Sequence, residues 1–220
     1  MPRAQQPGLF SDAPELPSRE VITEGAVLLR GYTLDPAPAL LQEVDSITKI
    51  APFRHMITPG GFRMSVAMTN CGRAGWVSDR KGYRYDPIDP DRAAPWPPMP
   101  ARFAELANKA AAEAGFPNFE TDVCLINRYA PGTKLTLHQD KDEHDFTAPI
   151  VTVSLGLSAV FLFGGLTRKE RPRRIEVNHG DLVIWGGQAR LAYHGIAPLP
   201  EGVHPQTGPF RISLTFRKAL

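Results

Sequence analysis

The stretch that decides the fold runs from Cys124 to Asp140 and reads CLINRYAPGTKLTLHQD. Two strand-forming runs in it are separated by the turn signal Pro131-Gly132. The same texture of short apolar runs and turns continues downstream, so we expect about eight strands with no helix between them. The expected strands are Cys124–Tyr129, Lys134–Gln139, Ile150–Leu157, Val160–Phe163, Arg174–Val177, Leu182–Trp185, Ala192–Gly195 and Phe210–Arg217. This pattern predicts a jelly roll over about residues 122–218, whose mouth is a natural place for a ligand pocket.

Outside this core, the sequence predicts two flanking helices and a lid. Apolar residues at helical spacing between Leu40 and Ile47 predict the first helix, and a second apolar stripe predicts another over about residues 100–114. Residues from about 52 to 98 are polar and aromatic with few long apolar runs, which favours hairpins and loops laid over a core. We also expect a loose tail over residues 1–20, a short strand over Gly25–Arg30, and a single domain over residues 21–220.

The composition is that of a soluble globular protein, with 42% hydrophobic and 22% charged residues in a chain of 220. No run approaches the roughly 20 apolar residues that span a bilayer, and the N-terminus lacks a secretion signal, so we expect a cytoplasmic protein. The only cysteines, Cys71 and Cys124, form no CxxC pair, which argues against a zinc or disulfide framework. The net charge of +2 indicates no particular partner. The basic run Arg168–Arg174 could meet phosphates, or it could simply be a solvated loop.

The candidate metal ligands begin with His138 and Asp140. Residues two apart on a strand point the same way, so this imidazole and carboxylate can hold one ion. A second such pair, His179 and Asp181, directly precedes an apolar strand and is better explained as a turn. His194 is the candidate third ligand, with a buried structural histidine as the alternative. Two imidazoles and one carboxylate with open coordination positions fit iron(II), and zinc in a hydrolase is the rival interpretation.

The C-terminal run Arg211–Arg217 supports the iron interpretation. Arg211, Ser213, Thr215 and Arg217 fall at even spacing and share one strand face, while the residues between them are apolar. Two guanidiniums on one face suit a ligand with two carboxylates, because each can bind a carboxylate with two hydrogen bonds. A zinc site would leave these buried cations unexplained. We therefore expect an iron- and 2-oxo-acid-dependent oxygenase.

Several stretches together resemble the AlkB family of DNA alkylation-repair dioxygenases, over roughly residues 20–218. The likeness is carried by Pro52–Arg54, Thr58–Gly61, Met64–Gly72, Cys124–Glu143, Ile150–Leu157, His179–Gly187, Tyr193–Gly195 and Leu214–Arg217. The resemblance implies a double-stranded β-helix core with an N-terminal nucleotide-recognition lid, and iron(II) held by His138, Asp140 and His194.

The resemblance also implies a 2-oxoglutarate site, with Arg211 on the distal carboxylate and Arg217 nearer the metal-bound end. The set implied for this cosubstrate is Asn127, Arg128, Tyr129, Arg211, Ser213, Thr215 and Arg217. The chain departs from the family at Ser213, where related sequences carry asparagine, although a hydroxyl can also hydrogen-bond.

For the substrate, the resemblance implies that Trp76 stacks on a flipped nucleobase, with His138 on the other face of the base. A carboxylate at Asp142 would face the base edge and favour the positive charge of N1-methyladenine or N3-methylcytosine. The full set implied for substrate contacts is Trp76, Tyr83, Arg84, Tyr85, Asp142 and Arg168.

The expected activity is oxidative demethylation of such bases in DNA, preferably single-stranded, as a direct-reversal repair reaction. The reaction would use iron(II), 2-oxoglutarate and dioxygen and release formaldehyde, succinate and carbon dioxide. We expect a monomer that binds alkylated DNA and no membrane. The alternatives are the same chemistry on RNA or on a protein side chain, and a non-catalytic binder of damaged DNA.

Overall fold

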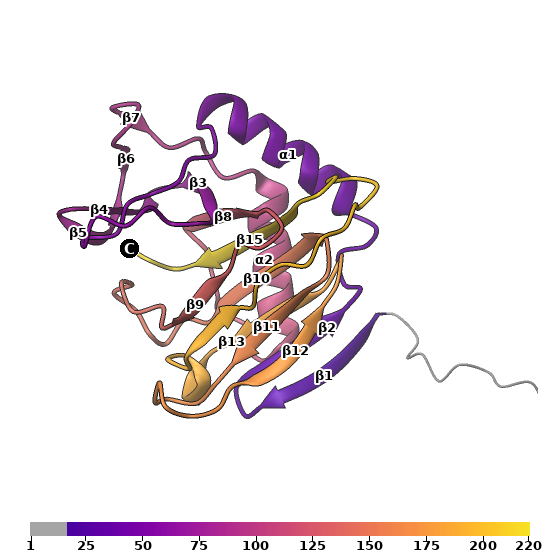
Figure 1. The fold of residues 1–220 in the computed structure, drawn as a ribbon. Coiled ribbons are helices and arrows are strands. Elements are labelled where there is room, and N and C mark those ends of the chain that lie inside the picture. Colours follow the sequence, from indigo (N-terminus) through magenta and orange to yellow (C-terminus); the bar gives the residue numbers. More distant parts are fainter. Residues whose placement is uncertain (1–16) are drawn as a thin grey trace, which may run out of the picture.

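Two facing antiparallel sheets form the core of the protein, of which the computed structural model describes residues 17–220 (Figure 1). In spatial order, the larger sheet contains β1 (Ser18–Thr23), β2 (Ala26–Arg30), β13 (Leu182–Trp185), β10 (Ile150–Gly156), β15 (Arg211–Arg217), β8 (Val123–Tyr129) and β3 (Ala67–Gly72). The smaller sheet contains β12 (Arg173–Val177), β11 (Ala159–Phe163), β14 (His194–Ile196) and β9 (Leu135–His138). All eight predicted strands are present to within two residues of their expected ends, and the jelly-roll prediction is confirmed.

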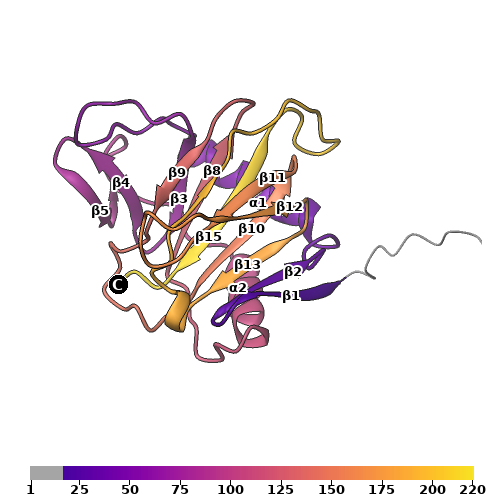
Figure 2. The same cartoon turned by 60° about the horizontal axis from the view of Figure 1, so that its bottom comes forward.

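The remaining elements lie around this core. A hairpin made of β4 (Gly75–Asp79) and β5 (Gly82–Asp86) projects from one side of the molecule (Figures 1 and 2). The other short elements are the pair β6 (Ile88–Asp89) and β7 (Ala94–Pro95) and the 3₁₀ turn η1 (Gly187–Ala189). No helix among residues 17–220 is both long and apolar enough to cross a membrane.

Side-chain alternation gives the larger sheet two different faces. On β15, Ile212, Leu214 and Phe216 belong to the apolar cluster beneath the two helices, whereas Arg211 and Arg217 point between the sheets. Trp185 of β13 and aromatic residues of β11 fill the space between the sheets on the second face. The strand that carries the basic residues is therefore fixed by the burial of its own apolar residues on the opposite side.

Both helices form where the apolar spacing predicts them. α1 (Ala37–Ile50) starts after Pro36 and buries Leu40, Val44 and Ile47, and α2 (Ala101–Glu113) buries Phe103 among its alanines. They cover the face of the larger sheet that is turned away from the smaller one (Figure 2). Phe103 meets Phe216 edge to face, with ring centroids 5.8 Å apart, which joins α2 to the back of β15.

Two predictions about the N-terminal half were partly wrong. The loose tail was expected over residues 1–20; residues 1–16 lie outside the described range, but Ser18 to Glu20 belong to β1. This strand is an exposed edge strand with mostly polar residues, so it shows no apolar alternation. The lid was expected to contain no core strand, yet β3 is buried in the larger sheet. Its polar residues Thr69 and Asn70 are buried because they hydrogen-bond to the backbone of Ala51 and Trp76.

Candidate metal centre and its pocket

Three candidate ligands meet at the open end of the smaller sheet. His138 ends β9 and His194 begins the neighbouring β14, where the two are direct register partners. Asp140 follows β9 by two residues, and its two carboxylate oxygens lie 3.6 Å from His138 Nε2 and 3.7 Å from His194 Nε2. The three ligand atoms all lie within 4.8 Å of one another. Two imidazoles and one carboxylate on one side of a point, with the rest open, form the facial arrangement typical of non-haem iron(II).

The backbone holds both imidazoles in the orientation that a metal needs. The Nδ1 atom of His138 lies 2.9 Å from the carbonyl oxygen of Thr136, and that of His194 lies 3.0 Å from the carbonyl of Ala192. A carbonyl oxygen can only accept, so each Nδ1 carries the proton and each Nε2 presents a lone pair toward Asp140. The two rings are thus set as ligands by bonds made within their own chain segments.

Burial and charge tune the two buried ligands differently. Burial, together with His138, lowers the pKa of His194 to about 4, so this ring is neutral and able to bind a metal at physiological pH. Burial would by itself raise the pKa of Asp140, but Arg217 and the two histidines hold it well below its usual range. The centre therefore contains one anionic carboxylate beside the neutral imidazole of His194, and both can bind a divalent cation.

The low pKa of His194 predicts how the metal-free protein responds to acid. Its folded-state pKa lies below its ordinary value of 6.5, so between about pH 6.5 and pH 4 the unfolded chain binds a proton that the folded protein does not. We expect the free energy of unfolding to fall by about 2–3 kcal/mol from this residue between pH 7 and pH 4.5. Denaturant unfolding with a chelator at both pH values measures the loss. His194→Gln should remove this part of the pH dependence, and an equal loss in that variant would assign it elsewhere.

The candidate ligands open into a cavity of about 430 Å³ between the two sheets. At its inner end lies Arg211, which is 1% exposed and is aimed from β15 toward the ring of Tyr129 and the hydroxyl of Ser154. Only its Nη2 atom has a hydrogen-bond partner among the described residues, at 2.9 Å from Ser154 Oγ, while Nε and Nη1 have none. The buried carbonyl oxygen of the Asn127 side chain also lacks a partner there. Buried donors without partners are costly, and they mark the place where a polar ligand fits.

A row of hydroxyls lines the wall between the two arginines. Thr152 of β10 lies 3.0 Å from Ser213 and 3.2 Å from Thr215, measured between hydroxyl oxygens. Ser213 and Thr215 lie on the cavity side of β15, as their even spacing predicted. The wall can therefore both donate and accept hydrogen bonds along the length of a bound acid.

Arg217 lies at the other end of this wall and is already paired. Its Nε and Nη2 atoms donate to Asp140 Oδ2 at 2.9 and 2.5 Å, and its Nε atom lies 3.3 Å from Glu143. Only Nη1 is without a partner among residues 17–220. The pairing with Asp140, Tyr85 and Glu143 outweighs burial and raises the pKa of Arg217 above its ordinary value. This arginine thus orients the candidate carboxylate ligand.

Two residues that sequence reasoning missed complete this network. Glu143 is buried and accepts hydrogen bonds from Tyr85 at 2.6 Å and from Arg190 at 3.1 Å. Arg190 is buried too, and donates in addition to the backbone carbonyls of Asp140 and Ala148. Glu143 lies in the charged run from Lys141 to Asp145, and Arg190 is an isolated charge in a loop. Both patterns ordinarily indicate solvated side chains, so the local sequence does not reveal that the two are buried.

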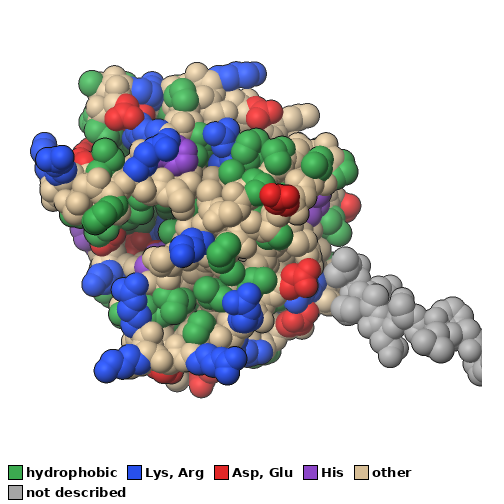
Figure 3. All heavy atoms as spheres, viewed as in Figure 1, with side chains coloured by type: hydrophobic (Ala, Val, Ile, Leu, Met, Phe, Trp, Pro, Cys, Tyr) green, Lys and Arg blue, Asp and Glu red, His purple; other side chains and the backbone are tan. Residues whose placement is uncertain are grey.

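The β4–β5 hairpin closes the outer end of the cavity with aromatic rings. Trp76 and Tyr83 stack with centroids 5.5 Å apart and planes inclined by 13°. The indole Nε1 of Trp76 donates to Asp142 at 2.8 Å, which fixes the ring over the cavity. Arg168 and Lys141 also line the cavity, and Figure 3 shows Lys and Arg side chains around a hollow between this hairpin and β9. The outer chamber therefore combines an aromatic wall, one carboxylate and a basic rim.

Three residues predicted for the site lie elsewhere. Arg128 points to the opposite face of β8 from its neighbours Asn127 and Tyr129, and its guanidinium lies between the rings of Phe53 and Phe210. Placing it at the cosubstrate was wrong, because adjacent residues of a strand face opposite sides. Arg84 lies on the face of the hairpin opposite Trp76, paired with Asp79 and Asp86. Tyr85 lies behind the cavity wall, bonded to Glu143.

The second His-x-Asp pair has a structural role, as its sequence context indicated. Asp181 accepts hydrogen bonds from the backbone of Gly31 and Asn178 and from the side chain of Arg30. His179 accepts one from the backbone N–H of Gly156. Cys71 and Cys124 are both free and buried.

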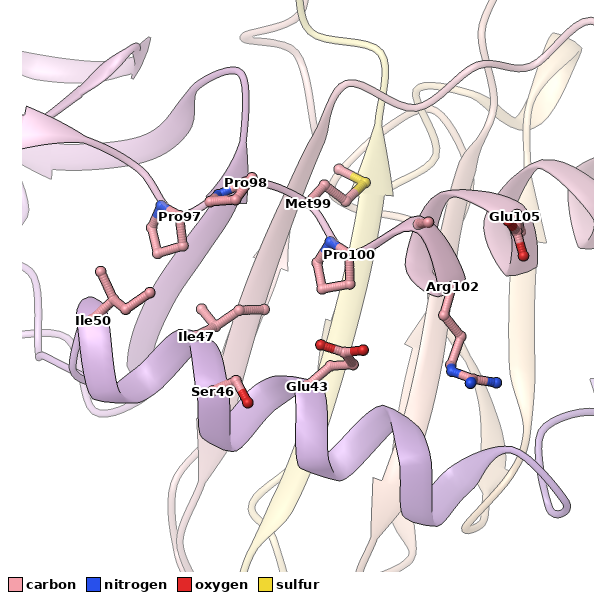
Figure 4. Close-up of a pocket in the computed structure, with 11 residues that line it drawn as sticks. Glu43, Ser46, Ile47, Ile50, Pro97, Pro98, Met99, Pro100, Arg102 and Glu105 are labelled. Atoms are coloured by element: carbon pink, nitrogen blue, oxygen red, sulfur yellow. The ribbon is translucent and has the colours of Figure 1, made fainter.

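A second hollow, of about 560 Å³, lies between α1 and the start of α2 (Figure 4). Its walls are Ile47 and Ile50 of α1 and the prolines of Pro97–Pro100, with Glu43, Arg102 and Glu105 at its edge. It contains one basic and two acidic side chains and no group of metal-ligating residues. The smaller cavity at His138, Asp140 and His194 is therefore the candidate functional site.

Comparison with known proteins places these features in context. Residues 25–217 match the family model of the 2OG-Fe(II) oxygenase superfamily. The chain is 54% identical over 211 residues to the alpha-ketoglutarate-dependent dioxygenase AlkB of Escherichia coli (strain K12), covering 96% of this chain and 97% of that protein. It is 32% identical over 108 residues to the tRNA demethylase abh1 of Schizosaccharomyces pombe, covering 49% and 35% of the two chains. The solved structure of OsALKBH1 superposes with a TM-score of 0.81 at 26% identity, covering 91% of this chain and all of that one.

Proposed function

The chain belongs to the AlkB family within the 2OG-Fe(II) oxygenase superfamily, and from this premise we propose that it removes methyl groups oxidatively from alkylated bases of DNA. The observation that carries the proposal is one continuous cavity with three parts. An unsatisfied buried arginine lies at its inner end, a His-Asp-His centre lies in its middle, and an aromatic wall lies at its mouth. This order matches a cosubstrate, a metal and a flipped base.

The donor set fits iron(II) and 2-oxoglutarate. His138, Asp140 and His194 would hold the metal, and the partnerless nitrogens of Arg211 would receive the distal carboxylate of the acid. Asn127 and Tyr129, on the same face of β8, lie beside that end. When bound, iron(II) with 2-oxoglutarate and dioxygen supplies the oxidant that hydroxylates the methyl carbon, with release of succinate, carbon dioxide and, from the base, formaldehyde.

The residues of this chain contribute position and charge. Arg217 keeps the Asp140 carboxylate ionised and aimed at the metal position, and the backbone carbonyls at Thr136 and Ala192 keep both imidazoles aimed at it. Trp76 and the ring of His138 bound the outer chamber, where a planar base would be held at reacting distance. A second oxygen of Asp142 is free to face a base that carries a positive charge, as N1-methyladenine and N3-methylcytosine do.

The base must leave its stack to enter this cavity. Extrusion is cheapest from a single strand, or where methylation has already broken the base pair. This favours single-stranded DNA as the preferred substrate. We further propose that the protein acts as a monomer in the cytoplasm.

Formaldehyde release from a panel of methylated substrates tests the proposal. Oligodeoxynucleotides containing N1-methyladenine or N3-methylcytosine should give stoichiometric formaldehyde and succinate, faster from single strands than from duplexes. Matched RNA is an informative arm, because one relative is named as a tRNA demethylase. Faster turnover of RNA or of a methylated peptide would reassign the substrate. Tight binding of methylated DNA without succinate would identify a non-catalytic binder.

Trp76→Ala should weaken substrate binding without disturbing the metal centre. Removing the indole deletes one stacking surface, worth about 1–3 kcal/mol, so we expect KM for a methylated oligonucleotide to rise about 5- to 150-fold. Iron affinity should stay within twofold, because the indole contacts Asp142 and Tyr83 rather than the three candidate ligands. Trp76→Phe should recover most of the loss. Unchanged KM in the alanine variant would remove Trp76 from the base site.

A further inference from the structure

Phe62 is the most exposed aromatic residue in the part of the chain that the structure describes, with 76% of its surface accessible. It lies in a turn between Ile57 and Arg63, which form an isolated antiparallel bridge. An exposed phenyl ring costs free energy in water, and nothing in the fold of residues 17–220 packs over it. Single exposed apolar residues are common on protein surfaces, so the place of this ring in the fold matters more than its exposure.

The turn that carries this ring is well ordered. The backbone N–H of Thr58 donates to the carbonyl of Phe62 at 2.8 Å, and the N–H of Phe62 donates to the hydroxyl of Thr58 at 3.1 Å. Gly61 takes a φ of +82°, which glycine adopts without strain. The ring lies against Gly60, where an added Cβ would come within 3.4 Å of it. One side of the ring is thus supported by backbone and the other is open to solvent.

The turn stands at the mouth of the candidate site. Thr58 and Met64, on either side of the ring, line the cavity. The hydroxyl of Ser78, on β4, donates to the carbonyl of Ile57 at 2.8 Å, which ties the turn to the hairpin that carries Trp76. Phe62 is not among the residues that line the cavity, so it lies on the rim, outside the chamber for the flipped base.

The surroundings of the ring are basic. Arg63 is exposed and next to it in sequence. The hydroxyl of Ser65 donates to the backbone carbonyl of Lys134 at 3.2 Å, so the backbone of a second exposed basic residue lies beside the strand that follows the turn. An exposed aromatic ring with basic residues nearby can bind single-stranded nucleic acid, with a base on the ring and phosphates on the cations.

We propose that Phe62 is a stacking platform for the nucleobase next to the flipped one, with Arg63 and Lys134 on the adjoining phosphates. The proposal rests on the proposed action on nucleic acid. It adds a second base subsite outside the cavity, and it explains an exposed ring that the chemistry at the metal does not use. A base of any identity would bind there, because every base presents a flat face.

A double-mutant cycle, which combines a change at Phe62 with a change in the DNA, tests this subsite. Binding is measured for single-stranded DNA with one methylated base, either intact or with an abasic residue at the neighbouring 5′ or 3′ position. Phe62→Ala should weaken binding of the intact strand about 5- to 150-fold. The loss should disappear when the abasic residue occupies the neighbouring position, whereas Phe62→Trp should bind at least as tightly as the parent. Val203→Ala removes a similarly exposed apolar side chain from a loop outside both chambers and serves as the control.

The outcomes separate this inference from the proposed function. If Phe62→Ala binds intact and abasic strands as the parent does, the platform is refuted while demethylation stands. The platform is refuted in the same way if the variant loses equal affinity for both strands, or loses affinity for a methylated mononucleotide, because the ring would then support the turn rather than a base. If the parent protein demethylates no oligonucleotide, the proposed function itself fails.

Discussion

Replacing Arg211 by methionine should raise the 2-oxoglutarate concentration for half-maximal turnover at least about 100-fold while leaving the metal-free protein as stable as the parent or more so. A bidentate pair with the distal carboxylate would be lost, which accounts for a change of about 3 kcal/mol or more. In the metal-free protein the same guanidinium is buried with two nitrogens unpaired among the described residues. Burial lowers its pKa by more than the neighbouring Tyr129 raises it, so the charge is only partly compensated. An apolar side chain of similar volume removes that cost, about 1–4 kcal/mol in comparable buried sites.

Two measurements establish this pair of effects. Succinate formation against 2-oxoglutarate concentration gives KM, and denaturant unfolding without iron gives stability. Arg128→Met is the matched control, because Arg128 lies on the adjacent strand beside Ile212 but on the opposite face, between Phe53 and Phe210. Its KM should match that of the parent. A large rise in KM in the Arg128 variant, or none in the Arg211 variant, would contradict the assignment of the inner chamber.

Asp140→Asn should abolish iron-dependent turnover, with a loss of at least about 1,000-fold. The amide keeps the shape of the side chain but removes the only anionic member of the candidate ligand set. It also leaves Arg217 with Glu143 as its remaining carboxylate partner, so we expect a loss of about 1–3 kcal/mol in the free energy of unfolding. Anaerobic iron(II) titration should show binding weakened in parallel with turnover.

Asp181→Asn provides the matched control for this change. Asp181 stands in the other His-x-Asp pair and accepts hydrogen bonds from Gly31, Asn178 and Arg30. The variant should lose stability to a similar degree but bind iron(II) and turn over like the parent. If Asp140→Asn retains turnover with iron, or if Asp181→Asn loses iron binding, the ligand assignment is wrong.

The sequence predicted much of this architecture because simple periodicities govern it. Alternation on Arg211–Arg217 specified which side chains face the cavity, and two-residue spacing brought His138 and Asp140 together. The same alternation points Arg128 and Asn127 to opposite faces of the strand. The error arose because Arg128 was assigned to the cosubstrate together with its neighbours, although adjacent strand residues face opposite sides. β1 and β3 could not be recognised, because an edge strand needs few apolar residues and the polar residues of β3 are satisfied by distant backbone. Glu143 and Arg190 are buried only through tertiary pairing, which leaves no local signal.

The carboxylate of Glu143 joins segments that are far apart in the sequence. Tyr85 reaches it from the lid hairpin, Arg190 from the turn after η1, and Arg217 from β15. Arg217 also pairs with Asp140. Because these residues contact one another, the ordering of the hairpin and the binding of a metal at the centre are thermodynamically linked. If a bound nucleotide fixes the hairpin and thereby raises metal affinity by some factor, bound metal raises nucleotide affinity by the same factor. The lid and the centre are therefore two ends of one equilibrium, and each can be measured by titrating the other.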